Sequence, residues 1–252
     1  MSHQKADSEA LGEREGLAEA VAAAFSACQA TTRDALVRRA EILDFCAGDT
    51  VVAQGDESRI VLVLEGRIGY RRTTVDGREV IPRVASRGQL ATMMPIAGRA
   101  SVMEAMALSA CRVAQWSGAE LRSLADGDPG FALDLLEHVL LTFEAVVERL
   151  DGLLHQDAAR RVARVLEQHA DIIFGDTAPL ARGFLPALVG TSREMTGRVL
   201  RQLESDGVLE RVGRDRLRLL DPARLARTAE APPAEADARN KFLAVRGRAM
   251  QE

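Results

Sequence analysis

The chain has 252 residues, of which 47% are apolar and 28% charged, so it is long enough for one or two domains with a sizeable core. No apolar run approaches the roughly 20 residues that span a bilayer. The polar, acidic residues 1–16 lack the basic start and apolar stretch of a secretory signal. The cysteines Cys28, Cys46 and Cys111 are scattered and imply no disulfide framework. We therefore expect a cytoplasmic protein with reduced thiols and no membrane partner.

The N-terminal half changes from a helical to a strand-like pattern. Residues 8–30 are rich in Ala, Glu and Leu and predict a helix, within an N-terminal helical extension of residues 1–30. Short β-branched runs follow between residues 42 and 116, at 50–52, 60–64, 68–70, 80–81 and 111–114. Asp76-Gly77, between two of these runs, is a hairpin signal. Many short strands at this spacing indicate an antiparallel barrel or jelly roll, which we assign to residues 31–130.

A long amphipathic helix is predicted from residue 131 to about 154, within a helical segment of residues 131–156. Its apolar residues alternate in spacing between three and four, which is the heptad pattern of a coiled-coil seam. The seam consists of Leu136, Val139, Phe143, Val146, Leu150 and Leu153, and a second apolar line contains Leu140, Val147 and Leu154. If one line faces the barrel and the other a partner helix, the helix forms the interface of a homodimer. The alternative is a helix that packs only within its own subunit.

The C-terminal part differs from the rest in charge. Residues 157–227 contain 13 arginines and 10 acidic residues, a net charge of +3 in a chain whose formal net charge is -4. Asp157 is suited to cap a new helix over residues 158–169. A basic segment on an acidic body is typical of a DNA-reading module. We therefore assign a second domain to residues 157–227, followed by a tail of residues 228–252.

Residues 180–220 carry the pattern of a winged helix-turn-helix. A short apolar helix ends at Gly190, where glycine suits the turn, and Ser192 caps a second helix. Four apolar residues of that helix are predicted to pack inward: Met195, Val199, Leu200 and Leu203. Alternating runs at 208–211 and 216–219 predict a hairpin, the wing. The predicted fold class is therefore α+β, with an N-terminal antiparallel β jelly-roll barrel, a long dimerisation helix and a C-terminal winged helix-turn-helix.

The first turns of the second helix are the candidate DNA site. Arginine donates two hydrogen bonds to guanine in the major groove, and glutamate accepts one from cytosine. Arg193, Glu194 and Arg198 lie on or near this leading face. The predicted DNA-binding residues are Thr191, Ser192, Arg193, Glu194, Thr196 and Arg198. The alternative is a solvated surface on which Arg198 pairs with Glu194 at i,i+4.

Residues 189–200, Val-Gly-Thr-Ser-Arg-Glu-Met-Thr-Gly-Arg-Val-Leu, resemble the DNA-binding helix of the Crp/Fnr family of transcription regulators, in which Gly-x-Ser-Arg-Glu-x-x-x-Arg recurs. The resemblance implies a homodimer on palindromic double-stranded DNA, with TGTGA-like half-sites read by Arg193, Glu194 and Arg198. An activator of this family would also contact RNA polymerase. Two departures stand upstream. Pro186 predicts that the first helix starts late, near residue 184, or is distorted, and Ala181 replaces a phosphate-contacting Thr or Ser.

The same resemblance makes residues 31–130 a cyclic-nucleotide-binding-like sensor domain. The family cassette reads Gly-Glu-Leu-Ala, with an Arg ten residues after the Glu and then Ser or Thr. Gln89 and Arg99 match its two ligand-binding positions and are the effector-site candidates. However, Gln89 replaces the Glu, and Ala100 replaces the hydroxyl residue. Each lost hydrogen bond costs about 1–3 kcal/mol, so a cyclic nucleotide is not the favoured cofactor.

The effector therefore stays unknown, and several alternatives stay open. The pocket is either empty, filled by its own side chains, or an apolar site lined by methionines: Met93, Met94, Met103 and Met106. No iron–sulfur cluster is expected, because the chain has three cysteines and such a cluster needs four thiolates. For haem, His138 and His155 are candidates by residue type alone.

Other functional classes find less support in the sequence. A cupin enzyme needs histidine ligands inside the barrel, and no histidine lies between residues 42 and 116. We find no nucleophile elbow, P-loop or paired-carboxylate pattern, so we expect no enzyme and no metal site. The alternative function is a cyclic-nucleotide-binding regulatory protein that acts on a protein partner, which would leave the helix-turn-helix unexplained. A dimeric regulator without an effector is a further alternative.

Overall fold

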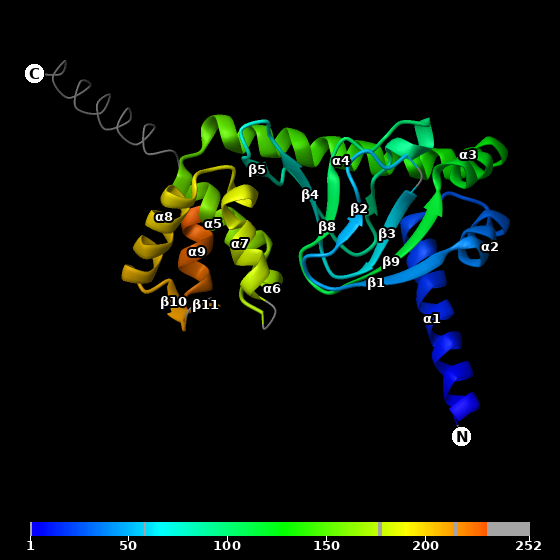
Figure 1. Ribbon diagram of the computed structural model, residues 1–252, viewed down its shortest axis with the longest axis horizontal. Coiled ribbons are helices and arrows are strands. Elements are labelled where there is room, and N and C mark those ends of the chain that lie inside the picture. Colours follow the sequence, from blue (N-terminus) through cyan, green and yellow to red (C-terminus); the bar gives the residue numbers. More distant parts are fainter. Residues whose placement is uncertain (1, 58, 176–177, 214–215, 231–252) are drawn as a thin grey trace, which may run out of the picture. The chain divides into compact units, whose positions relative to one another are not determined.

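The structure is a computed structural model that describes residues 2–57, 59–175, 178–213 and 216–230 (Figure 1). It divides into two compact units, residues 1–146 and 147–252. The boundary falls within one long helix, α4 (Pro129–His155). Among the helices of the described residues, none combines the length and the apolarity that crossing a bilayer requires.

Two helices precede the first strand, α1 (Ser2–Ala24) and α2 (Ala30–Arg39). Leu17, Val21 and Phe25 are buried in one apolar core together with Ile60 and Trp116. The N-terminal extension is therefore an integral part of the first unit, and its burial contributes to the stability of the sheet.

The helix predicted over residues 8–30 is interrupted at residues 25–29. In this interruption the Asp134 carboxylate accepts hydrogen bonds from the backbone N–H groups of Ala27, at 3.0 Å, and Cys28, at 2.9 Å. The Asp128 carboxylate accepts one from the N–H of Gln29, at 2.8 Å. These bonds satisfy backbone donors that a continuous helix would have satisfied internally, so the chain turns here at little cost.

The strands between residues 41 and 117 form two antiparallel sheets (Figure 1). The first has the order β1 (Glu41–Phe45), β9 (Cys111–Ser117), β3 (Arg59–Glu65) and β7 (Leu90–Ala91). The second has the order β2 (Thr50–Val52), β8 (Glu104–Ala107), β4 (Ile68–Thr73) and β5 (Glu79–Val80), and β6 (Val84–Ala85) also pairs with β4. Buried residues of both sheets, including Val61, Val63, Ile68 and Ala105, share one core.

The predicted antiparallel jelly roll is confirmed, but its two sheets do not close into a continuous barrel. Within the described residues, the edge strands β1 and β7 of one sheet do not pair with the edge strands β2 and β5 of the other. Closure requires every strand to pair on both sides, and β5, β6 and β7 are each two residues long and provide few hydrogen bonds. The antiparallel, jelly-roll-like stack of two sheets agrees with the rest of the predicted fold class.

Strand β3 shows why a continuous apolar run forms a strand here. All residues from Ile60 to Leu64 are buried. Ile60, Leu62 and Leu64 pack in the core that includes α1, whereas Val61 and Val63 pack in the core between the sheets. The strand is therefore covered on both faces, and its apolar residues need no alternation with polar ones.

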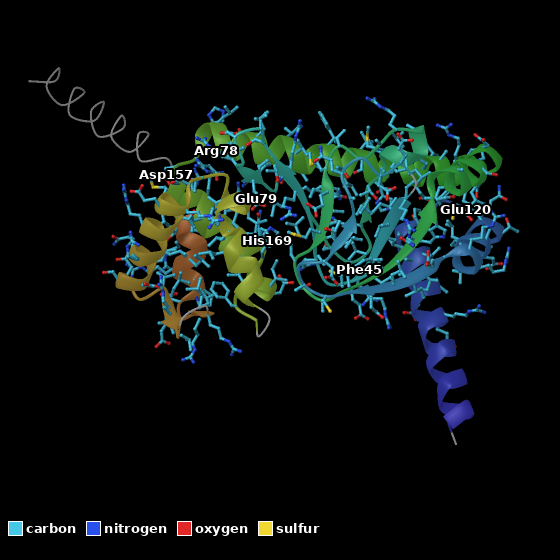
Figure 2. The ribbon with its side chains drawn as sticks, in the orientation of Figure 1. Phe45, Arg78, Glu79, Glu120, Asp157 and His169 are labelled. Atoms are coloured by element: carbon cyan, nitrogen blue, oxygen red, sulfur yellow. The ribbon has the colours of Figure 1, made fainter. Side chains whose placement is uncertain are left out.

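A helix that the sequence analysis missed, α3 (Gly118–Gly127), follows β9. Its start is a capping box. The hydroxyl of Ser117 accepts from the backbone N–H of Glu120, and the carboxylate of Glu120, labelled in Figure 2, accepts from the N–H of Ser117 at 3.0 Å. The short 3-10 helix η1 (Met94–Ala97) lies between β7 and β8. Helix α4 buries Phe131, Leu135 and His138 and exposes many of its other apolar residues.

The second unit combines several helices with a small hairpin at its edge (Figure 1). The elements are α5 (Ala158–Gln168), α6 (Ala170–Ile173), α7 (Ala178–Val189), α8 (Arg193–Ser205), β10 (Leu209–Val212), β11 (Arg216–Leu219) and α9 (Pro222–Glu230). Helix α5 packs against α7, α8 and α9, and its residues Val162 and Leu166 are fully buried.

Two expectations for this unit have different outcomes. The cap at Asp157 is confirmed, since its carboxylate accepts from the N–H of Arg160 at 2.8 Å (Figure 2). The late start of the first motif helix near residue 184 is wrong, because α7 begins at Ala178 and includes Pro186.

Candidate nucleic-acid interface and ligand pocket

The turn between α7 and α8 depends on glycine. Gly190 has φ of +72°, and both its N–H and that of Thr191 donate to the carbonyl oxygen of Pro186, at 2.9 and 3.1 Å. A Cβ at position 190 would lie 2.9 Å from Leu153 Cδ2. Both the left-handed backbone and this close contact disfavour any other residue, which confirms the turn expected from the sequence.

Ser192 starts α8 as predicted, because its hydroxyl accepts from the N–H of Met195 at 3.1 Å. The inward face of the helix is Thr196, Val199, Leu200 and Leu203, at spacings of three, one and three. The predicted inward residue Met195 is instead half-buried. The buried face begins one position later than the apolar pattern indicated.

Thr196 is 3% exposed, and its hydroxyl donates to the carbonyl oxygen of Ser192 at 3.0 Å. This hydrogen bond stabilises the first turn of α8, and the Thr196 side chain does not face solvent. We therefore leave Thr196 out of the set proposed to contact DNA. Of the two predicted residues that precede the helix, Ser192 is exposed and Thr191 is half-buried.

The opposite side of α8 is charged and exposed. Arg193, Glu194 and Arg198 all face solvent. Arg198 Nη2 lies 3.1 Å from Glu194 Oε1, the i,i+4 pair that was the alternative interpretation. The two side chains are 63% and 81% exposed, and such a pair contributes only about 0.3–0.5 kcal/mol. The pair therefore does not prevent either group from exchanging its partner for a base edge.

The predicted wing is confirmed as the antiparallel hairpin β10–β11. Leu209 and Leu217 are buried, while Arg216 and Arg218 are exposed. Arg218 Nη1 pairs with Glu210 Oε2 at 3.2 Å across the hairpin. The wing thus presents arginines to solvent beside a helix whose exposed side is also rich in arginine.

The end of α4 and the turn of the motif are joined by Arg149. Its Nη2 donates to the carbonyl oxygen of Leu188 in the last turn of α7. Burial, and secondarily the charge of Arg161, lower the pKa of Arg149. No local sequence pattern indicates this contact, because Arg149 and Leu188 are far apart in the chain.

The first unit contains a pocket of about 250 Å³, which we call the methionine pocket. Its apolar lining consists of Met93, Met94, Val102, Met103, Val139 and Val146. Three of the four methionines noted in the sequence are therefore in the lining, whereas Met106 of β8 does not line the pocket and is 2% exposed. Helix α4 contributes to the wall through Val139 and Val146.

One cation lies in the wall of the methionine pocket. Arg83 Nη1 donates to the hydroxyl oxygen of Tyr70 at 2.8 Å and to the carbonyl oxygen of Leu90 at 3.3 Å. Its guanidinium carbon also lies 5.1 Å from the centroid of the Tyr70 ring. Burial raises the pKa of Tyr70, so its phenol is neutral near pH 7. Neither residue was among the effector-site candidates expected from the sequence.

The two effector-site candidates do not line this pocket. The Gln89 side-chain oxygen accepts from the backbone N–H of Ser86 at 3.0 Å, which closes the turn before β7. Arg99 is exposed beside η1. The structure therefore does not bring Gln89 and Arg99 together around the methionine pocket, although their linear spacing resembles the family cassette.

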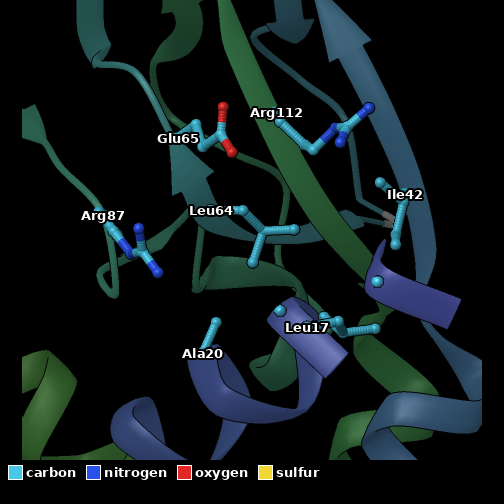
Figure 3. Close-up of a pocket in the computed structure, with 9 residues that line it drawn as sticks. Leu17, Ala20, Ile42, Leu64, Glu65, Arg87 and Arg112 are labelled. Atoms are coloured by element: carbon cyan, nitrogen blue, oxygen red, sulfur yellow. The ribbon is translucent and has the colours of Figure 1, made fainter. Parts of the chain in front are cut away.

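A second cavity, of about 430 Å³, lies between α1 and the first sheet (Figure 3). Leu17 and Ala20 of α1 form one wall, and Leu64, Arg87 and Arg112 line the opposite part (Figure 3). Arg112 is paired with Asp44, with 2.9 Å between Nε and Oδ1. This pairing fixes the guanidinium of Arg112 on the strand surface.

The two histidines considered as haem ligands and two of the three cysteines occupy ordinary structural positions. His138 is buried, its Nε2 is 2.9 Å from the carbonyl oxygen of Ala24, and burial lowers its pKa. His155 is exposed, with Nε2 3.7 Å from Asp151 Oδ1. Burial raises the pKa of the thiols of Cys28 and Cys111, which keeps them protonated and poorly reactive. Within the described residues, no three His, Cys, Asp or Glu side chains gather as metal ligands would.

The apolar seam predicted on α4 is largely exposed. Leu136, Phe143 and Leu150 have exposed fractions of 51%, 66% and 54%. The other exposed residues of the seam and of the second apolar line are Val139, Leu140, Val146, Val147, Leu153 and Leu154, and Leu133 and Leu141 of the same helix are exposed as well. An apolar surface this long on one helix is unusual for a protein that acts as a monomer.

Comparison with known proteins agrees with this architecture. Residues 42–128 match the sequence profile of the cyclic nucleotide-binding domain, and residues 160–228 match that of the Crp-like helix-turn-helix domain. The CRP-like cAMP-activated global transcriptional regulator of Mycobacterium tuberculosis is 27% identical over 221 residues, which are 81% of this chain and 95% of that protein. The cAMP-activated global transcriptional regulator Vfr of Pseudomonas aeruginosa is 25% identical over 182 residues, 68% of this chain and 85% of the relative.

Solved structures show the same fold. A CRP/FNR-family transcriptional regulator from Thermus thermophilus gives a TM-score of 0.64 at 22% identity, over 76% of this chain and 100% of that chain. The c-di-GMP responsive global regulator CLP of Xanthomonas campestris gives 0.63 at 21% identity, over 77% and 100%. Fold, motif and relatives define a transcription regulator with a helix-turn-helix DNA-binding domain. Its two matched domains cover more than half of the sequence, and the chain belongs to the Crp/Fnr family.

Proposed function

We propose that the protein acts as a homodimer that reads a palindromic, TGTGA-like DNA site through α8, gated by an effector in the first unit. The observation that carries this proposal is the division of α8 into two sides. Thr196, Val199 and Leu200 are buried, whereas Arg193 and Arg198 are exposed at the capped, N-terminal part of the helix. Helix N-terminal residues of such motifs enter the major groove, where arginine recognises guanine.

The dimer part of the proposal rests on α4. Its exposed apolar residues follow the heptad spacing that two parallel helices bury against each other. Pairing along α4 would place two copies of α8 about one DNA turn, roughly 34 Å, apart on a palindrome. An activator would make its further contacts with RNA polymerase.

The effector part rests on the first unit. Relatives of this fold carry names that refer to different ligands, cAMP in one and c-di-GMP in another. Fold alone therefore does not identify a ligand, and the lining of the pocket has to do so. A regulatory protein that acts only on another protein would leave the exposed arginines of α8 without a role.

The test is fluorescence anisotropy of the full chain on a TGTGA-N6-TCACA duplex and on a scrambled duplex at one fixed salt concentration. Arg198→Ala should weaken binding to the palindrome by about 1–3 kcal/mol and relax the preference at one base pair of each half-site. The matched control is Arg38→Ala, which removes an exposed arginine from α2 and should leave both affinities unchanged.

If Arg198→Ala lowers the affinity for all duplexes equally, Arg198 contacts phosphate and does not read a base. If it changes no affinity while the wild type is selective, the Glu194 ion pair is the full role of this residue.

A further inference from the structure

We propose that the methionine pocket binds a small hydrophobic monoanion, a carboxylic acid with an alkyl or aryl body, whose carboxylate pairs with Arg83. The pocket offers one fixed cation in a wall that is otherwise mostly apolar. This inference names the effector class for the proposed function, and its regulatory consequence rests on that function. Ligand binding itself is measured without DNA, so the two proposals can fail separately.

Arg83 is held in place but not neutralised. Its Nη1 group donates to the Tyr70 hydroxyl and the Leu90 carbonyl, and the Tyr70 ring lies under the guanidinium. Among the described residues, no carboxylate pairs with Arg83, and its Nε and Nη2 groups make no hydrogen bond. A half-buried cation with two free donors on one edge is arranged for a bidentate carboxylate.

The other polar groups of the pocket are already used. Thr92 Oγ1 donates to the carbonyl oxygen of Arg59 at 2.9 Å, Ser101 Oγ to that of Met103 at 2.7 Å, and Thr142 Oγ1 to that of His138 at 2.7 Å. These hydroxyls therefore have no proton left for a ligand. A cyclic nucleotide would bury ribose and base acceptors without donors, which costs affinity for each unpaired group. A ligand with one anionic group and no other polar atom avoids that cost.

The rest of the lining fits an apolar body. Met93, Met94 and Met103 are flexible and polarisable, and side chains of this kind adapt to alkyl or aromatic ligands. The volume of about 250 Å³ lies just below the range of about 300–1,000 Å³ usual for drug-sized ligands, which indicates a small molecule.

The pocket also gives the ligand a route to the dimer helix. Val139, Thr142 and Val146 of α4 form part of its wall. A ligand between these residues and Met103 contacts the same helix that carries the exposed apolar seam. Occupancy is thereby expected to change how α4 packs, and through it the affinity for DNA.

The experiment is titration calorimetry of the full chain with octanoate, and with octanol as the neutral molecule of the same length. Phenylacetate and phenylethanol form a second pair with an aryl body, and cyclic AMP is the competing ligand. Each carboxylate is expected to bind about 10- to 100-fold more tightly than its alcohol. Arg83→Met should abolish that difference while the alcohols bind as before. Arg78→Met, which removes an exposed arginine from the neighbouring hairpin, should retain it.

Three results would overturn the proposal: equal affinities of wild type for acid and alcohol in both pairs, discrimination that survives in Arg83→Met, or tighter binding of cyclic AMP than of either acid. If Arg83→Met does not fold, the acid and alcohol pairs on the wild-type protein decide the question, because they remove the anionic group from the ligand instead of the cation from the protein.

Discussion

Replacing Phe143 by Asp is expected to convert the proposed homodimer to monomers without unfolding the subunit. Phe143 is 66% exposed on α4, so its side chain contributes little to the core of its own subunit. A phenylalanine side chain buries about 200 Å², and two thirds of that area at about 25 cal/mol per Å² corresponds to about 3 kcal/mol. Two copies in a symmetric interface double this to about 6 kcal/mol, or roughly four orders of magnitude in the dimer dissociation constant.

Sedimentation velocity over a range of protein concentrations measures this constant, and urea unfolding of the same sample measures subunit stability. The matched control is Val75→Asp, which introduces the same charge at a fully exposed position in the hairpin between β4 and β5. We expect the control to dimerise like the wild type. An unchanged dissociation constant for Phe143→Asp would refute the assignment of α4 as the interface.

Three further substitutions test local features by urea unfolding. Gly190→Ala should destabilise the fold by about 1–2 kcal/mol, because alanine resists the left-handed backbone at this position. The control Gly183→Ala, in α7, should be neutral or stabilising. Equal effects of the two substitutions would contradict the role of the turn. Asp134→Asn should lower the free energy of unfolding by about 1–3 kcal/mol, because the Asp134 carboxylate accepts from two backbone N–H groups. The control Asp126→Asn, at an exposed position, should change it by less than about 0.5 kcal/mol. Burial holds the pKa of His138 below its ordinary value of 6.5. As the pH falls, the histidine is therefore protonated in the unfolded chain before it is protonated in the folded one. The wild type should consequently lose stability as the pH falls from 6.5. His138→Gln should lose less over the same interval, and identical pH profiles would remove His138 as the cause.

Features set by neighbouring residues were predictable from the sequence. The caps at Asp157 and Ser192, the turn at Gly190 and the wing all depend on chemistry within a few residues. The buried face of α8 was predicted with one error: Thr196 takes the position expected for Met195, since its hydroxyl is satisfied by the backbone and a polar residue can then be buried.

Features assembled from distant segments were not predictable. The break after α1 depends on Asp134, which lies more than 100 residues from the N–H groups that it accepts from. The open sheets depend on which short strands find partners. The methionine pocket joins Tyr70, Arg83, the segment after β7 and α4, whereas the linear cassette pattern pointed to Gln89 and Arg99. Spacing along the chain therefore located the pocket's neighbourhood and three of its methionines, but not Tyr70 and Arg83.

Random-site selection with the full chain tests, without assuming a sequence, whether the proposed dimer reads an inverted repeat through α8. We expect enrichment of a palindrome whose half-site centres lie about 10 base pairs apart. We also expect the Arg198→Ala variant to enrich a motif relaxed at one position of each half-site. Enrichment of no motif, or of the same motif by both proteins, would contradict the assignment of α8 as the reading helix.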